Sequence, residues 1–163
     1  MTLRTSNEAN HWIGLALRVL GLGVFALAFF LPAVRSGATG PDAVVLPGWK
    51  CASVALTETV GLFGKSVAWP PSLPILLVIF SGWINPFIVL VLLSSFVSKL
   101  RVLRRILGVL ILLCMAATWA FFSMQKVTPL IGHFLWIGGA LLILAPDAIG
   151  GERRRPAAAA EAS

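Results

Sequence analysis

The fold is decided by residues 73–97, which read LPILLVIFSGWINPFIVLVLLSSFV. This stretch contains no charged residue. At a rise of 1.5 Å per residue, a helix of this length crosses a hydrocarbon core about 30 Å thick. The stretch also lacks the alternation of polar and apolar residues that is typical of the strands of a membrane barrel. It therefore predicts a membrane-spanning helix.

Three further segments, 12–34, 106–124 and 130–149, are also long and apolar, with Arg18 near the start of the first and Asp147 at the end of the last. The chain is 58% hydrophobic and only 12% charged, whereas a soluble domain usually carries about 25% charged residues. We therefore predict an all-α integral membrane protein, a four-helix transmembrane bundle in a single domain, 1–149. Arg18 and the apolar run that follows it also resemble a signal peptide, and cleavage there would leave three spans.

The basic residues predict the orientation of the bundle, because cytoplasmic loops carry an excess of Lys and Arg. Of 13 such residues, nine face the cytoplasm when both termini lie there, in a bacterial inner membrane. A disordered basic tail, 150–163, belongs to this side. The net charge of +7 then needs no nucleic-acid partner, and we expect the two arginine groups to contact anionic lipid headgroups. These groups are Arg101, Arg104 and Arg105, and Arg153, Arg154 and Arg155.

Residues 35–72 form the predicted outer loop, the only substantial segment outside the membrane. Within it Trp49, Ala52, Leu56, Val60 and Phe63 recur at intervals of three and four residues. This spacing indicates a short helix that lies on the outer membrane surface or caps the bundle. An irregular loop is the alternative.

Asn85 and Pro86 lie near the middle of the second span. Proline removes one backbone donor and its ring clashes with the carbonyl four residues earlier, that of Gly82, so a kink is expected. Asn85 then either bonds a neighbouring helix and sets the register of the bundle, or helps to form a polar pocket.

Two ionisable side chains of the predicted spans, His133 and Arg18, are candidate functional positions, whereas Asp147 lies at the membrane edge. His133 is in the first turn of the fourth span, close to the outer interface, where we expect it to act as a polar anchor without a metal. Arg18 is in the first span, and we expect its side chain to extend to the headgroup region. The alternative for Arg18 is a headgroup or an acidic partner inside the bundle.

Small residues recur every seven positions in the first and fourth spans, and such rows let helices approach closely. They are available for packing inside the bundle or for contacts with another protein. The residues are Gly14, Gly21 and Ala28, and Gly132 and Gly139.

These features lead to three hypotheses about function. The first is a structural or accessory subunit that acts through lateral helix packing, as a homo-oligomer or within a larger membrane complex. The second is a channel or transporter component that uses the kink at Asn85 and Pro86. The third is an outer-face enzyme or ligand sensor built on Glu58 and His133. The sequence contains no catalytic or metal-binding motif, and we expect no cofactor.

Overall fold

Four longer helices and a pair of shorter ones separated by a single residue account for most of the described chain, as expected for a helical membrane protein. The computed structural model describes residues 2–36, 43–64 and 72–149. The predicted tail, 150–163, with Arg153, Arg154 and Arg155, lies outside these residues. The helices are α1 (Thr2–Ala28), α2 (Gly48–Gly64), α3 (Leu73–Gly82), α4 (Ile84–Ser94), α5 (Arg101–Gln125) and α6 (Ile131–Ile149), with one 3₁₀ turn, η1 (Ser98–Leu100).

Three stretches are long and apolar enough to cross a membrane: Leu73–Ser94, Arg101–Gln125 and Ile131–Ala148. At most a third of the residues in each are buried inside the protein, so large apolar faces are left for lipid. The apolar part of α1, Trp12–Ala28, is shorter. The chain is therefore a multi-pass membrane protein with three clear spans, and the first predicted span is a helix, α1, whose apolar part is shorter and which packs along α6.

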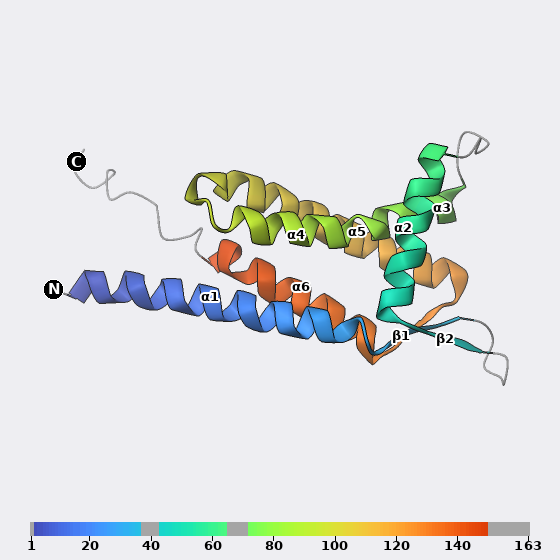
Figure 1. Cartoon of the computed structure of the whole chain (residues 1–163), viewed down its shortest axis with the longest axis horizontal. Coiled ribbons are helices and arrows are strands. Elements are labelled where there is room, and N and C mark those ends of the chain that lie inside the picture. The colour runs from blue at the N-terminus through green and yellow to red at the C-terminus, as the bar shows by residue number, and fades with distance from the viewer. Residues whose placement is uncertain (1, 37–42, 65–71, 150–163) are drawn as a thin grey trace, which may run out of the picture.

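The helices form two antiparallel pairs, in which α1 lies along α6 and α4 lies along α5 (Figure 1). The largest fully buried side chains of their shared core are aliphatic: Ile84, Ile88, Val91, Ile111 and Ile143. Helix α2 runs across one end of these pairs (Figure 1). We call this the sheet end of the molecule, and the opposite end, where Arg104 lies, the arginine end.

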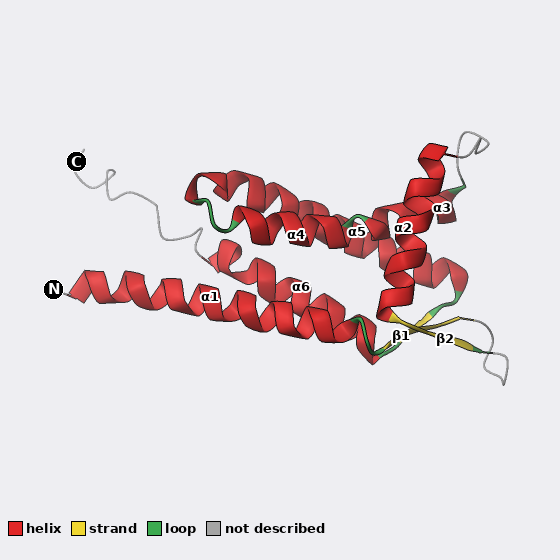
Figure 2. Cartoon of the chain, viewed as in Figure 1, coloured by secondary structure: helices red, strands yellow, loops and turns green. Residues whose placement is uncertain are grey.

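The prediction of an all-α fold is wrong in one respect, because the sheet end contains a small antiparallel sheet (Figure 2). Its strands are β1 (Pro32–Ser36), β2 (Val44–Pro47) and β3 (Thr128–Pro129), in the order β2-β1-β3. Val34 is paired with Leu46 on one side and with Pro129 on the other.

The first helix therefore ends earlier than predicted, at Ala28 instead of residue 34. Pro32 cannot donate to a helical hydrogen bond, and the backbone beyond it pairs with two other segments instead. Thr128 and Pro129, directly before the last helix, form β3. The Leu130 amide donates to the Ala33 carbonyl at 2.8 Å.

The second span is interrupted as predicted. Helix α3 ends at Gly82 and α4 begins at Ile84, so that Trp83 lies at the break. The cause is Pro86, which has no amide proton for the Gly82 carbonyl. Because the Phe87 amide donates to the Trp83 carbonyl at 3.1 Å, the helix resumes directly after the interruption.

Helix α2 confirms the helical interpretation of the outer loop, but its apolar stripe points outward. Trp49, Leu56 and Val60 are exposed, whereas Ala55 and Thr59 are buried. A Cβ atom at Gly82 would lie 3.0 Å from the Ala55 carbonyl oxygen and from the Thr59 hydroxyl. The small face of α2 therefore packs on α3 at the glycine before the break.

The predicted rows of small residues form the contact between α1 and α6. A Cβ atom at Gly21 would lie 2.8 Å from the Gly139 carbonyl oxygen, and Gly14 faces Pro146. Gly132 approaches the Leu31 and Pro32 carbonyls, and Ala28 is 1% exposed. The rows therefore serve packing inside the molecule.

Gly139→Val tests this contact. Its Cβ atom would lie 2.6 Å from the Phe25 amide nitrogen, and backbone atoms cannot move aside. We expect a loss of about 1–3 kcal/mol in the free energy of unfolding, measured by reversible denaturation in mixed micelles. Gly138→Val is the matched control, because its Cβ atom would meet nothing within 4 Å in the described structure. Equal losses in the two variants would contradict the contact.

Candidate functional site

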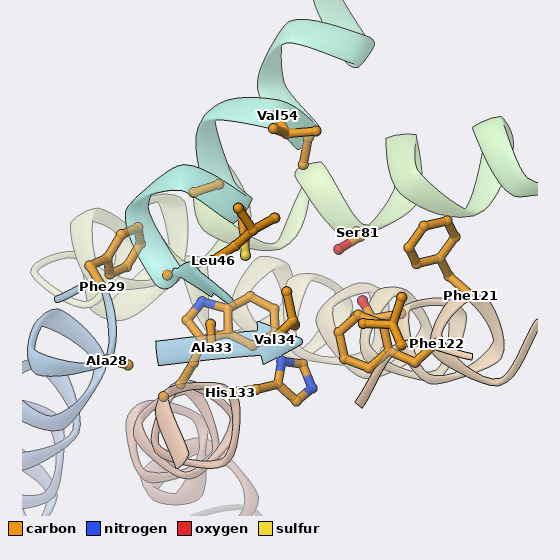
Figure 3. A pocket seen from close by; sticks show the side chains of 18 of the residues that line it. Ala28, Phe29, Ala33, Val34, Leu46, Val54, Ser81, Phe121, Phe122 and His133 are labelled. Carbon is orange, nitrogen blue, oxygen red and sulfur yellow. The ribbon is translucent and has the colours of Figure 1, made fainter. Parts of the chain in front are cut away.

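A cavity of about 270 Å³ opens at the sheet end (Figure 3). Its walls come from the end of α1, from α2, α3, α4, α5 and α6, and from the strands, and they include Leu46, Val54, Val78, Phe121 and Phe122. Most of its lining is apolar. The cavity exists because α2 contacts α3 through small residues while its other end is attached to the sheet.

Few polar side chains reach this cavity, and they come from separate helices. Ser81 and Asn85 flank the break in the second span, while Thr118 and His133 come from α5 and α6. The Thr118 hydroxyl donates to the Cys114 carbonyl at 2.9 Å, which satisfies its proton within its own helix. An apolar cavity with a few convergent polar groups is the common form of a small-molecule site.

Asn85 bonds a neighbouring helix, as one of the two predicted alternatives required. The Trp136 indole Nε1 donates to Asn85 Oδ1 at 3.1 Å. This bond connects the kinked span with α6. The Asn85 amide protons make no hydrogen bond to other described residues. Pro86, by contrast, is exposed and does not line the cavity.

His133 is more deeply buried than an interfacial anchor would be, with 6% of its surface exposed. It lies among four aromatic rings, stacked on Trp136 at 5.5 Å between centroids and edge-on to Phe122 at 4.8 Å. Trp119 and Phe134 are the others. Figure 3 shows the imidazole beside Phe122 and Val34. Its Nε2 atom is buried and makes no hydrogen bond to any described residue.

Cys51 lines the cavity from α2. Burial raises the pKa of its thiol above the ordinary value, and a hydrogen bond to the backbone opposes this only in part. The thiol is therefore protonated at neutral pH. The other cysteine, Cys114, is buried in the helical core and is not part of the lining.

Glu58 is not part of this site. Its side chain is exposed on α2 and does not line the cavity. The predicted combination of Glu58 with His133 is therefore wrong, although α2 and His133 do share a cavity. Among the described residues no three His, Cys, Asp or Glu side chains come together as they would for a metal ion.

A second polar cluster lies at the arginine end. Arg18 Nη2 donates to Asp147 Oδ2 at 2.8 Å, and Arg104 Nε donates to Asp147 Oδ1 at 2.9 Å. Arg18 is therefore not the unpaired, extended side chain that was predicted, because it forms the alternative, a pair with an acidic partner inside the bundle. In an apolar environment, a guanidinium and a carboxylate that form an ion pair have a lower free energy than the same two groups left unpaired.

Arg104 holds this cluster together. It also donates to the Ser94 carbonyl at 2.8 Å and to the Val97 carbonyl at 3.1 Å, which lie at the end of the second span. Its 8% exposure corrects the prediction that it contacts lipid headgroups. Asp147 thereby links α1, α5 and α6, and Arg104 adds α4.

Asp147, Cys51 and Trp136 were not among the predicted site residues. For Asp147 the sequence did contain a signal, because it is the one acidic residue in the last turn of an apolar span, at the end where Arg18 and Arg104 also lie. Cys51 and Trp136 stand out only in three dimensions.

Comparisons with protein-family models, with curated proteins and with solved structures found no match.

Asn85 and Trp136 form a pair whose coupling can be measured. A double-mutant cycle of Asn85→Leu and Trp136→Phe, followed by denaturation in mixed micelles, should give a coupling of about 1 kcal/mol. A control cycle of Asn85→Leu with Ser95→Ala should give a coupling near zero, because the Ser95 hydroxyl donates to the Val91 carbonyl instead. Similar values in both cycles would argue against a specific bond.

The charge cluster predicts unequal effects for its members. Asp147→Ala leaves two guanidinium groups without their carboxylate and should lower the free energy of unfolding by about 3 kcal/mol. Arg18→Gln leaves the Arg104 pair intact and should cost about 1 kcal/mol. Thermal unfolding of the two variants in the same detergent measures the difference. An equal loss of stability in the two variants would mean that the pair of Asp147 with Arg104 contributes nothing measurable, which would contradict the cluster.

Proposed function

We propose that this protein binds a small, mainly apolar molecule in the cavity at its sheet end. The observation that carries the proposal is an apolar cavity of about 270 Å³ with polar side chains at a few points on its wall. A cavity of about 150 Å³ in another protein accommodates benzene, so the present one has room for about two fused rings.

The walls favour a flat ligand with one hydrogen-bonding group. His133 and Trp136 are stacked with each other, and both line the cavity. The amide group of Asn85, whose oxygen already accepts from Trp136, has two further protons to donate. An aromatic ring that bears a hydroxyl or carbonyl group could stack on the aromatic wall and accept a hydrogen bond from the Asn85 amide.

The proposal includes a position in the membrane. We infer that α1 crosses the bilayer as a fourth span, antiparallel to α6, with both termini in the cytoplasm of a bacterial cell. The arginine end then faces the cytoplasm, which agrees with the distribution of Lys and Arg. In this orientation α2 and the cavity lie at the outer surface, where an apolar ligand arrives from the outer leaflet.

The two other hypotheses stay predictions with less support. Lateral helix packing was inferred from rows of small residues, and those rows are occupied by the contact between α1 and α6. The channel hypothesis relied on Asn85 and Pro86, of which the first bonds Trp136 and the second is exposed.

Alkylation of Cys51 provides the test, because this thiol lies in the cavity wall. The Cys114→Ala protein is purified in detergent and treated with N-ethylmaleimide, with and without 1-naphthol. We expect 1-naphthol to slow the modification of Cys51, since ligand and reagent compete for one space. The rate is followed by intact-protein mass spectrometry.

Ala52→Phe is the test variant for the cavity, and Leu56→Phe is its matched control. Ala52 lines the cavity, whereas Leu56 is exposed on the other face of α2. Filling the cavity with Ala52→Phe should remove the protection by 1-naphthol, and Leu56→Phe should preserve it. No protection in the Cys114→Ala protein, or the same protection in Ala52→Phe, would refute the proposal.

A further inference from the structure

The cluster at the arginine end carries an unbalanced charge. Two guanidinium groups share the single Asp147 carboxylate, so one positive charge is left over. An isolated charge in a medium of low dielectric constant is costly, and an anion from outside the cluster would offset this cost.

The surplus belongs to Arg18 and not to Arg104. Arg104 donates to Asp147 and to two backbone carbonyls, and 9% of its side chain is exposed. The Arg18 side chain makes one hydrogen bond to the described residues, to Asp147, and its Nε is buried without a partner. It is also the more exposed of the two, at 19%. Nε is enclosed by the protein, so a further acceptor from outside would bind the protons of Nη1 and Nη2 that Asp147 does not use.

The residues of α1 that flank Arg18 are apolar. Leu15 and Leu22, one turn before and after it on the same face of α1, are exposed, and so is Val19. In a membrane protein such a face contacts lipid. The cluster also lies near the end of a span, since Ile131–Ala148 includes Asp147 at its last turn. Lipid phosphates are the anions available at this depth.

We propose that Arg18 is a binding site for the phosphate group of an anionic phospholipid. The headgroup accepts hydrogen bonds from the guanidinium and neutralises the surplus charge, and the acyl chains lie along Leu15 and Leu22. A charge-assisted bond of this kind distinguishes an anionic lipid from a zwitterionic one, whose headgroup carries its own positive charge. The site is independent of the cavity at the opposite end.

Native mass spectrometry of the full chain in detergent provides the test. Phosphatidylglycerol, phosphatidylcholine with the same acyl chains and inorganic phosphate are titrated separately. We expect the wild-type protein to retain phosphatidylglycerol in preference to phosphatidylcholine, and inorganic phosphate not to compete. Competition by inorganic phosphate at similar concentrations would assign the site to a soluble anion and overturn the lipid proposal.

Three variants identify the residue responsible. Arg18→Gln leaves a balanced Arg104–Asp147 pair, so the fold is preserved, and it should weaken phosphatidylglycerol binding about tenfold. Arg18→Lys keeps the charge and should restore most of the preference. Arg105→Gln removes an exposed arginine from the same end and should have little effect. Equal losses in Arg18→Gln and Arg105→Gln, or no recovery in Arg18→Lys, would overturn the proposal.

Discussion

The close approach of two backbones at Gly21 and Gly139 determines how the rest of this molecule is arranged. In lipid the hydrophobic effect does not drive helices together, so dispersion contacts between closely spaced backbones stabilise their association instead. Because α1 and α6 touch at this level, the chain on either side of the contact has little freedom. One turn towards the arginine end Arg18 reaches Asp147, and towards the sheet end Gly132 meets the carbonyls of Leu31 and Pro32.

The sheet end follows from this arrangement. Once α1 has ended at Ala28, the chain lies against the start of α6, and its free backbone groups pair with β2 and β3 instead of continuing a helix. The sheet positions the start of α2, and the contact of α2 with Gly82 positions its middle. The space between these two attachments is the cavity. Its form therefore depends on helix packing more than on any residue in its wall.

The scarcity of charge makes each charged group within the bundle informative. Asp147 accepts from arginines of two helices, and Arg104 also binds the carbonyls at the end of the second span. Charges at this depth persist only when they are paired. Two arginines share one carboxylate, so the cluster carries one more positive charge than an ordinary ion pair. We propose that a lipid phosphate neutralises this charge.

The sequence by itself determined that this is a multi-pass helical protein, because a segment that crosses a membrane must be a long, continuous run of apolar residues. Such a run can be recognised without knowledge of the tertiary structure. It also determined the break near Pro86 and the positions of small residues, since each depends on local chemistry, whereas a helix within 35–72 was one of two interpretations. Only the tertiary structure decided what these features meet. The partner of Arg18, the burial of His133 and the participation of Cys51 in a cavity depend on residues far away in the chain. The same holds for the sheet, since Val34 pairs with Pro129 across a separation that no local pattern encodes.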